Sequence, residues 1–320
     1  MNAAVVHAFD APPRYTTFSD PVAVDGEKLV TVTAAGLHPV VKAFANGTHY
    51  SSAGELPFIA GVDGAGRLED GTRVFFGTLR SPYGTFAELA VAPSWICFPL
   101  PDALDDVTAA GIANPGMSSW AALKMRAHLV EGENVLILGA TGVAGQLAVQ
   151  IAKRLGARRV IAAGRNPQAL EKLSGLGADA VVSLDQDHDS LVSALRREWT
   201  EYGIDIVLDY LWGSPTEAVI EAISQKGLRR AASRVRLIEI GSGAGKTISL
   251  PAATLRSSGL ELMGSGLGSV SMEKIGQSVN EFLKEAASAP FQVTMKPVPL
   301  RDVEAVWNRS EQGARFVFLP

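Results

Sequence analysis

The stretch "NVLILGATGVAGQLAVQIAKRLGA", Asn134 to Ala157, decides the fold. It begins as a short apolar run, turns through a glycine-rich segment, and continues with the periodicity of a helix. A dinucleotide-binding fingerprint requires this order of strand, turn and helix. In that interpretation Gly142 lets the backbone approach a pyrophosphate at the start of the helix, and Gly145 lets the helix pack close to the strand. A glycine turn that serves packing alone is the alternative.

The flanking chain shows two textures. From Met1 to about Asp106, short apolar runs punctuated by Gly, Pro and Asp are typical of β-structure. From about Gly132 to Gly241, short apolar runs alternate with segments of helical period, which predicts a parallel sheet covered on both faces. The strands predicted there are Val135–Leu138, Val160–Ala162, Ala180–Val182, Ile204–Leu208 and Val235–Ile240.

The C-terminal part adds a strand at Leu260–Gly264, a helix at Met272–Ala287, and a final strand, helix and strand. We therefore predict an α/β fold in which a βαβ domain is inserted between two parts of a β-rich domain. The first part is placed at 1–112 and the inserted domain at 113–256. Residues 257–320 supply an edge strand of the sheet and the return to the β-rich domain.

Composition excludes several classes of protein. The 320 residues are 47% hydrophobic and 19% charged, with 29 basic and 33 acidic residues and a net charge of −4. Such a balance gives no attraction to nucleic acid or to an anionic membrane. No apolar stretch approaches the roughly 20 residues that span a bilayer, and the start has no signal-peptide pattern. A single cysteine, Cys97, excludes an internal disulfide framework, so we expect a cytoplasmic protein.

The residues after the second predicted strand indicate which dinucleotide is bound. An NAD site usually places an acid there, about 20 residues after the glycines, to bond the ribose 2′-hydroxyl. Here that position is Gly164, followed by Arg165 and Asn166. Without the carboxylate a 2′-phosphate is not repelled, and Arg165 can bind it through a charge-assisted pair, which favours NADP(H). The alternative is that Arg165 is a solvated loop residue.

The predicted cofactor contacts surround the glycine-rich turn and the ends of later strands. They are Ala140, Thr141, Gly142, Val143, Ala144, Gly164, Arg165, Asn166, Ser118, Gly241 and Ser242. Ser118 lies where the chain crosses between the domains, in "GIANPGMSSW", and is expected to bond the nicotinamide amide or the ribose. Gly241 and Ser242 follow the strand at Val235–Ile240, and a plain surface turn is the alternative there.

A second glycine-rich segment, "GSGAGKT" at Gly241–Thr247, competes for the phosphate. A P-loop needs G-x-x-x-x-G-K-[ST], and the first glycine falls on Ile240. Pro251 also stands where the helix of a P-loop should run, and proline inside a helix costs about 3 kcal/mol. An ATP-binding enzyme is therefore a remote alternative.

Four segments together resemble one family. They are "LPFIAGVDGAG" (Leu56–Gly66), "YGTFAELAVAP" (Tyr83–Pro93), "NPGMSSWAAL" (Asn114–Leu123) and "GATGVAGQLAVQIAKRLGA". In this order they resemble the medium-chain dehydrogenase/reductases, most closely the zinc-free quinone oxidoreductase branch that includes zeta-crystallin-like proteins. The resemblance covers essentially the whole chain. It implies a GroES-like catalytic domain split around a Rossmann domain, and hydride transfer from NADPH to a quinone, enone or similar electron-poor carbonyl or alkene. It also implies a homodimer through the strand at Leu260–Gly264.

The resemblance argues against a metal. Zinc-dependent relatives carry a Cys, a His and a Cys or Asp as ligands, and the matching positions are His38, Val62 and Asn114. Catalytic zinc needs three protein ligands, and among these His38 alone could serve. We expect no metal.

The substrate side departs from the family pattern. Relatives carry "VNPxD" followed by a Tyr, whereas this chain has "LHPVVKAF", with His38 for the Asn, Val41 for the Asp and Ala43 for the Tyr. The catalytic candidates are His38, Tyr50 and Asn114. His38 can give a proton or a hydrogen bond to an acceptor that gains negative charge, or it can be structural. A catalytically weak NADPH-binding sensor or structural protein of the same fold is the alternative.

Overall fold

A computed structural model gives the structure, and it describes residues 1–52, 55–78, 80–224, 233–309 and 311–320. The chain divides into two units. Unit 1 comprises Met1–Pro115 and Val279–Pro320, and unit 2 comprises Gly116–Ser278. The divisions fall inside helix α2 (Asp106–Ala121) and helix α8 (Met272–Ser288).

Unit 2 contains a six-stranded sheet with the order β11-β10-β9-β12-β13-β14, in which every pairing is parallel. Its strands are β9 (Asn134–Leu138), β10 (Arg159–Gly164), β11 (Ala180–Ser183), β12 (Ile206–Asp209), β13 (Val235–Glu239) and β14 (Leu260–Gly264). In chain order the sheet is 3-2-1-4-5-6, so the strand order reverses between β9 and β12. This is the doubly wound Rossmann arrangement, and ligands of such sheets bind outside the carboxyl ends of the strands at the reversal.

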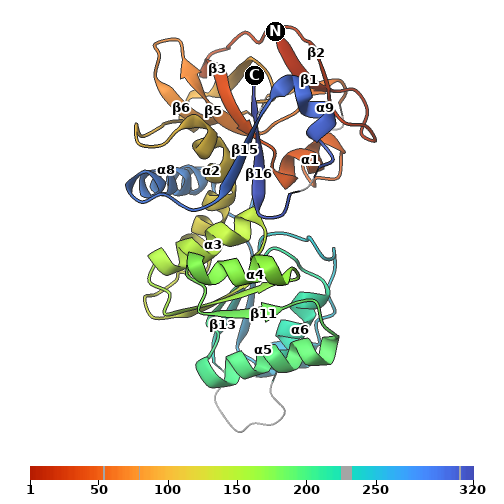
Figure 1. The fold of residues 1–320 in the computed structure, drawn as a ribbon, viewed down its shortest axis with the longest axis vertical. Helices are drawn as coiled ribbons and strands as arrows, with labels where there is room; N and C mark the ends of the chain where they lie inside the picture. The colour runs from red at the N-terminus through yellow and green to blue at the C-terminus, as the bar shows by residue number, and fades with distance from the viewer. Residues whose placement is uncertain (53–54, 79, 225–232, 310) are drawn as a thin grey trace. The chain divides into compact units, whose positions relative to one another are not determined.

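Helices cover both faces of this sheet, as Figure 1 shows, with α3 and α4 on one face and α5 and α6 on the other. The helices of the unit are α3 (Val143–Arg154), α4 (Pro167–Leu173), α5 (His188–Tyr202), α6 (Ser214–Ile223) and α7 (Ala252–Ser257), with short turns at Ala122–Arg126 and Ser174–Leu176. All five residues of β9 are buried, as a strand with helices on both faces requires. The core on the α5 and α6 face gathers Leu136, Val207 and Val219. Each such side chain stabilises the fold by about 1.5–3 kcal/mol.

The predicted strands of unit 2 agree with the structure except in their bounds. The strand at Leu260–Gly264 has the bounds predicted. β12 begins at Ile206, two residues after its predicted start at Ile204. Ile204 is buried but directly follows Gly203, whose φ of +82° ends helix α5, so the chain straightens into the strand only after this turn.

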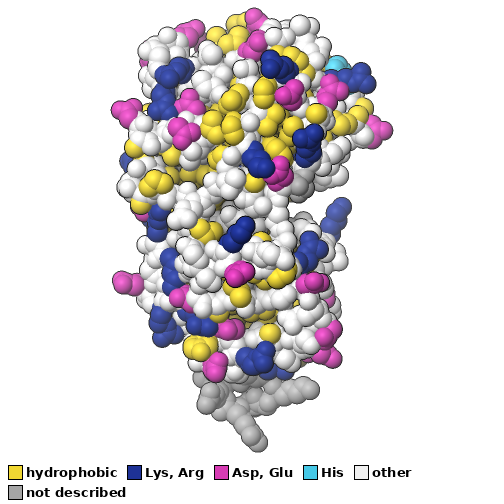
Figure 2. Space-filling model, viewed as in Figure 1, with side chains coloured by type: hydrophobic (Ala, Val, Ile, Leu, Met, Phe, Trp, Pro, Cys, Tyr) yellow, Lys and Arg dark blue, Asp and Glu magenta, His cyan; other side chains and the backbone are white. Residues whose placement is uncertain are grey.

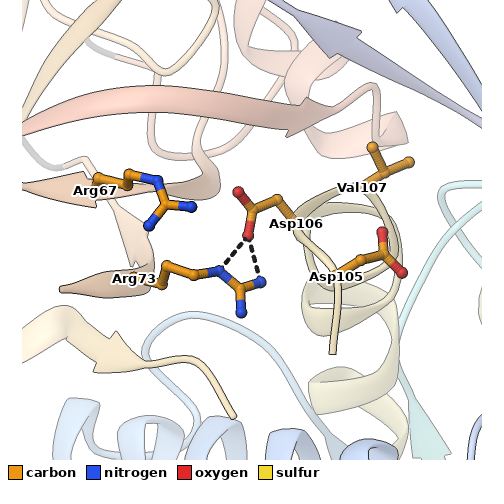
Figure 3. A pocket seen from close by; sticks show the side chains of 5 residues that line it. All are labelled: Arg67, Arg73, Asp105, Asp106 and Val107. Atoms are coloured by element: carbon orange, nitrogen blue, oxygen red, sulfur yellow. Dashed lines mark hydrogen bonds and ion pairs between the residues drawn. The ribbon is translucent and has the colours of Figure 1, made fainter. Parts of the chain in front are cut away.

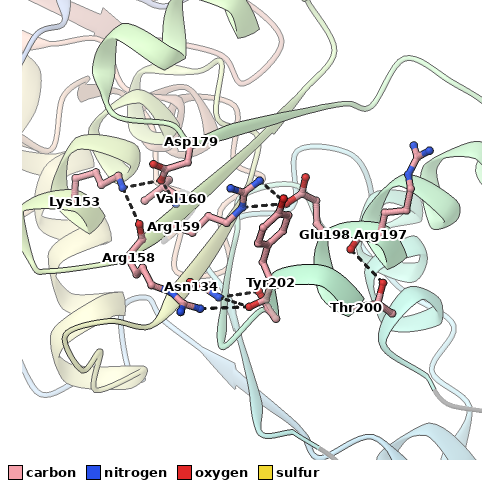
Figure 4. A network of polar contacts seen from close by, with 11 residues as sticks. Asn134, Lys153, Arg158, Arg159, Val160, Asp179, Arg197, Glu198, Thr200 and Tyr202 are labelled. Atoms are coloured by element: carbon pink, nitrogen blue, oxygen red, sulfur yellow. Dashed lines mark hydrogen bonds and ion pairs between the residues drawn. The ribbon is translucent and has the colours of Figure 1, made fainter.

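A polar network holds the amino ends of the strands (Figure 4). Asn134 Nδ2 donates to the carbonyl oxygens of Tyr202 and Gly203, at 2.6 and 3.1 Å. Arg159 pairs with Glu198 at 3.0 Å, and its guanidinium lies over the ring of Tyr202, 3.9 Å from the centroid. Because ligands bind at the opposite, carboxyl ends, this network stabilises the unit and does not recognise a ligand.

Unit 1 is β-rich. One sheet has the order β15-β16-β3-β5-β6-β8, with β7 also paired to β3, and a smaller sheet has the order β2-β1-β4. The strands are β1 (Asn2–Val6), β2 (Arg14–Thr17), β3 (Glu27–Gly36), β4 (Phe58–Ile59), β5 (Asp63–Leu68), β6 (Arg73–Gly77), β7 (Leu89–Pro93), β8 (Cys97–Pro99), β15 (Thr294–Pro299) and β16 (Ala314–Leu319). Besides parts of α2 and α8, the unit holds α1 (Pro39–Ala45), α9 (Val303–Val306) and turns at Ser94–Ile96 and Leu300–Asp302.

The core of unit 1 includes Phe76, Phe86 and Phe318, each fully buried, with Trp307 from the C-terminal segment. Residues from both ends of the chain therefore form one core. The predicted fold class, a β-rich domain split around a doubly wound parallel-sheet domain, is confirmed.

The surface carries both signs of charge. On the face of unit 2 that Figure 2 shows, acidic and basic side chains are interspersed. In the described parts of the chain, no helix combines the length and the apolarity needed to traverse a bilayer.

Candidate functional site

The glycine-rich turn joins β9 to α3 at the carboxyl end of the sheet. The N–H groups of Gly139 and Ala140 donate to the carbonyl oxygen of Ala163 on β10, at 3.0 and 2.9 Å. Gly139 has a φ of +88°, a conformation that favours glycine. At Gly145 a Cβ would lie against the Gly139 carbonyl and 2.5 Å from the Ala140 Cα, so packing of α3 on β9 requires this glycine.

Gly142 is different, because none of the residues that the structure describes requires a glycine there. Its φ and ψ of −78° and 165° are ordinary extended values, and a Cβ would meet only the Gly139 carbonyl at 3.6 Å. Gly142 caps α3 without a side-chain hydrogen bond, so the first N–H groups of the helix, at Val143 and Ala144, keep their hydrogen-bonding capacity. A bare helix N-terminus behind a missing side chain suits the pyrophosphate of a dinucleotide.

The packing at the end of β10 explains why Gly164 stands where an NAD site usually has an acidic residue. A Cβ on Gly164 would lie 2.5 Å from the Thr141 Cγ2, so the Thr141 side chain fills the space that an acidic side chain would enter. Asn166 caps α4 by accepting a hydrogen bond from the Ala169 N–H at 2.9 Å. Arg165 lies between them and is exposed. Of Gly164, Arg165 and Asn166, Arg165 therefore offers the cationic side chain for a phosphate.

The loops after β12 and β13 lie at the same carboxyl end of the sheet as the glycine-rich turn after β9. Asp209 is fully buried, and its carboxylate accepts hydrogen bonds from the N–H groups of Leu211 and Trp212, at 2.8 and 2.9 Å, and from the Thr216 hydroxyl at 2.5 Å. Burial raises the pKa of Asp209. These bonds shape the loop after β12. Gly241 donates from its N–H to the Asp209 carbonyl at 3.2 Å, which places it beside that loop.

The segment Gly241–Thr247 has no P-loop geometry. No helix follows it directly, because the next helix, α7, begins at Ala252 with Pro251 as its cap. Ser242, Lys246 and Thr247 are exposed on irregular backbone. The structure therefore lacks the turn-to-helix junction that would hold a nucleoside triphosphate.

Helix α2 reaches the same end of unit 2 through two serines. The Tyr210 hydroxyl lies 2.7 Å from the Ser119 Oγ and also bonds Ser118. Burial raises the pKa of Tyr210 to about 12, so the phenol stays protonated. The predicted residue Ser118 thus lies beside the end of β12.

In unit 1 the structure brings His38 and Asn114 together through an acid that the sequence did not single out. Asp63, at the start of β5, lies with Oδ1 3.2 Å from the His38 Nε2 and accepts a hydrogen bond from the Asn114 Nδ2 at 2.6 Å. His38 is 1% exposed and Asp63 7%. Burial lowers the pKa of His38, and the Asp63 charge opposes this shift only in part. The imidazole is neutral at neutral pH.

Two cations lie near this group. Arg315 on β16 is 8% exposed and donates from Nη1 to the Leu37 carbonyl at 2.7 Å. Burial lowers its pKa to about 10, against the attraction of Asp63. Lys42 on α1 is partly buried, and burial together with the Arg315 charge lowers its pKa.

Tyr50 differs from this buried group because it is exposed to solvent. Its side chain is 74% exposed, and its ring centroid is 4.2 Å from that of His49, which stacks in turn on Phe44. The structure gives Tyr50 a place on the surface of unit 1.

The residues near His38 do not fit a catalytic zinc. Its ring lies beside the carboxylate of Asp63, which in turn binds the Asn114 amide, and Val62 has no donor side chain. Over the described ranges, no three His, Cys, Asp or Glu side chains gather as a metal site would need. Burial also raises the pKa of the Cys97 thiol to about 11, which keeps it protonated.

A surface hollow of about 400 Å³ lies elsewhere in unit 1 (Figure 3). It is lined by Arg67, Arg73, Asp105, Asp106 and Val107. Arg73 binds the Asp106 carboxylate through Nε at 3.0 Å and Nη2 at 2.5 Å. The ion pair of Arg73 and Asp106 joins β6 to α2. Because the acidic and basic side chains that line the hollow neutralise one another, the hollow gives no sign of a ligand.

Comparison with known proteins agrees with this architecture. Residues 143–285 match the zinc-binding dehydrogenase family. A probable NADPH-dependent quinone reductase of Emericella nidulans is 28% identical over the full length of both chains. The human quinone oxidoreductase is 30% identical over 76% of this chain and 73% of its own. A solved quinone oxidoreductase of Thermus thermophilus, studied also with NADPH, is 26% identical with a TM-score of 0.81, covering both chains completely.

Fold and relatives together define a medium-chain dehydrogenase/reductase. Within that superfamily the chain belongs to the quinone oxidoreductase family, and it is therefore an oxidoreductase. The resemblance carried by the four sequence segments is confirmed.

Proposed function

We propose that this chain transfers a hydride from NADPH to a quinone, an enone or a similar electron-poor carbonyl or alkene, without a metal. Gly142 carries the proposal, because a glycine that neither the backbone nor the packing requires leaves a helix N-terminus bare. NADPH is the cofactor of the enzyme, in keeping with the relatives named for it.

The cofactor residues follow from this placement. Ala140 to Ala144 would hold the pyrophosphate at the turn, and Arg165 would pair with the 2′-phosphate beside Gly164. Asn166 would act through the cap that fixes the start of α4. Ser118, Gly241 and Ser242 would contact the nicotinamide half, and their position near the end of β12 supports this.

On the substrate side we assign His38 and Asn114 to one group with Asp63, which accepts a hydrogen bond from Asn114 and lies 3.2 Å from the His38 Nε2. The lowered pKa of His38 favours hydrogen bonding by a neutral ring over proton donation. Tyr50 is assigned a contact with the substrate from the surface of unit 1, which its 74% exposure permits.

Four further assignments complete the proposal. Unit 1 is the catalytic domain and unit 2 the NADP-binding domain; the sequence placed the latter at 113–256, and unit 2 runs from Gly116 to Ser278. No metal takes part, since the donors around His38 are too few. A homodimer forms through the open edge of β14. The protein works in the cytoplasm, where a chain with one unpaired cysteine suits the reducing conditions.

A catalytically weak NADPH-binding sensor is the second candidate. It is favoured by the burial of His38 and by Val41, which lies in the hydrophobic core where relatives carry a polar residue. NADPH binding without turnover of any acceptor would select it.

Titration of the purified protein with NADPH, NADH and Mg-ATP, followed by tryptophan fluorescence, tests the cofactor first. We expect NADPH to bind best, and Arg165→Ala to weaken NADPH by about 10- to 150-fold, since a hydrogen bond to a charged group contributes about 1.5–3 kcal/mol. Binding of NADH should change little in that variant. Lys246→Ala is the control and should leave NADPH binding intact.

Assays with quinones and enones then test the reaction. NADPH oxidation that depends on the acceptor supports the reductase. Binding of ATP alone, or an unchanged cofactor preference in Arg165→Ala, contradicts the assignment.

A further inference from the structure

Lys42 lies one helical turn after His38. His38 caps α1, and the Lys42 N–H points to the His38 carbonyl at 3.4 Å. Lys42 therefore lies in the first turn of the helix that starts from the buried His38. Arg315, whose charge acts on Lys42, binds the carbonyl of Leu37 beside that histidine. No role was assigned to Lys42 from the sequence.

The charges around Lys42 do not balance. The Asp63 carboxylate is already engaged by His38 and by Asn114, and its field also acts on Arg315. The charge that acts on Lys42 is that of Arg315, which is a second cation. Within the described chain, no carboxylate forms an ion pair with the Lys42 ammonium. Two cations and one buried anion leave a positive charge at the surface of this group.

Such an excess charge would normally be avoided in a stable core. Lys42 is partly buried, so water screens it less than it would screen a lysine on an open surface. Because no carboxylate of the described chain pairs with it, the Lys42 ammonium is available to interact with negative charge on a bound molecule. In a hydride transfer that charge develops on the acceptor oxygen.

Building on the proposed function, we propose that the Lys42 ammonium contacts the acceptor carbonyl oxygen and protonates it during reduction. In an enone, the hydride that NADPH supplies forms a C–H bond at the β-carbon, and the alkene π-pair shifts to join the α-carbon and the carbonyl carbon. The carbonyl π-pair moves onto oxygen, which takes a proton from the Lys42 Nζ. The products are NADP⁺, the enol and a neutral amine, which regains its proton from water.

A lysine is suited to this task in its surroundings. Burial and Arg315 lower the pKa of Lys42, which brings a proton donor closer to the working pH. The titratable groups around it are Arg315 on β16, Asp63 on β5, His38 at the start of α1, and His49 after the helix. Both histidines have a lowered pKa and are neutral above pH 7, so neither accounts for a change of activity in the alkaline range.

The test compares Lys42→Met, which keeps the length of the side chain, with Lys42→Arg, which keeps the charge. Lys28→Met removes an exposed lysine from β3 of the same unit and is the control. The values of kcat/KM for a quinone and an enone are measured at saturating NADPH from pH 7 to 10.5, with the Kd of NADPH for each variant.

We expect Lys42→Met to lower kcat/KM by about 10²-fold or more, as loss of a general acid does, while NADPH binding and the control are unchanged. Lys42→Arg should recover part of the loss. Wild-type activity should fall as the pH rises and Lys42 loses its proton, and this fall should be absent in Lys42→Met.

Three outcomes would overturn the assignment of Lys42. They are a rate for Lys42→Met within twofold of wild type, an unchanged alkaline fall in that variant, and a loss of NADPH affinity that accounts for its slower rate. If the wild type turns over no acceptor, the proposed reductase function itself is wrong and the assignment falls with it.

Discussion

Gly142 and Gly145 lie three residues apart in one turn, yet we predict opposite consequences for replacing each by alanine. A Cβ at position 145 would press on the backbone of Gly139 and Ala140, which cannot move without shifting α3 from β9. A Cβ at position 142 would make only an ordinary contact of 3.6 Å. Gly145 therefore serves packing, and we expect Gly142 to serve a ligand.

The expected magnitudes follow from these distances. Overpacking of a core costs about 1–3 kcal/mol, and each kcal/mol lowers Tm by roughly 2–4 °C in a domain of this size. Gly145→Ala should therefore lower Tm by about 2–12 °C. Gly142→Ala should leave Tm unchanged and raise the Kd of NADPH about tenfold or more, which corresponds to about 1.4 kcal/mol of lost binding energy.

Thermal unfolding without cofactor and fluorescence titration with NADPH measure the two effects separately. Gly175→Ala is the control, because its Cβ would meet nothing within 4 Å, and it should change neither quantity. Unchanged NADPH binding in Gly142→Ala would refute the placement of the pyrophosphate. An unchanged Tm in Gly145→Ala would refute the packing argument.

Three further predictions concern stability and assembly. Burial lowers the pKa of His38 in the folded state, so the unfolded state binds more protons and the free energy of unfolding decreases as the pH falls below about 6.5. The Tm of His38→Gln should therefore decrease less between pH 7.5 and 5.5 than the Tm of wild type. His188→Gln, at an exposed position, is the control. Asn134→Ala removes the side chain that donates hydrogen bonds to two carbonyl oxygens at the amino end of the sheet. The substitution should lower the free energy of unfolding by about 1–3 kcal/mol and leave the Kd of NADPH unchanged. A change in that Kd would show that this network reaches the ligand. In β14 the N–H of Leu262 faces the open edge of the sheet, because the residues on either side of it make the hydrogen bonds to β13. Leu262→Pro removes this N–H and should convert a dimer to a monomer, as measured by light scattering. A dimer that persists in this variant would contradict pairing through the β14 edge.

The fold could be predicted because its signals are local. Each strand of unit 2 is a short apolar run, and the turn at Gly139–Gly145 combines a buried strand with a helix cap in neighbouring residues. The spacing that excluded a P-loop at Gly241–Thr247 was also local, and the irregular backbone there agrees with it.

The site in unit 1 could be predicted only in part, because its contacts join distant segments. The sequence indicated His38 and Asn114, but Asp63 lies in a segment used for its resemblance alone. Arg315 approaches Leu37 across 278 positions of the chain, and no spacing rule connects them. The pKa of His38 depends on burial, which a lone histidine in a sequence does not reveal.

The position of β16 affects the order in which the protein can fold during synthesis. β16 pairs with β15 on one side and with β3 on the other, where Val317 lies opposite Gly36. The larger sheet of unit 1 therefore remains incomplete until residues 314–319 leave the ribosome. Unit 2 is one continuous segment and can reach its native pairing earlier. During synthesis unit 2 can thus be folded while β3 still lacks its neighbour β16, so the exposed edge of β3 can pair with other chains in this interval.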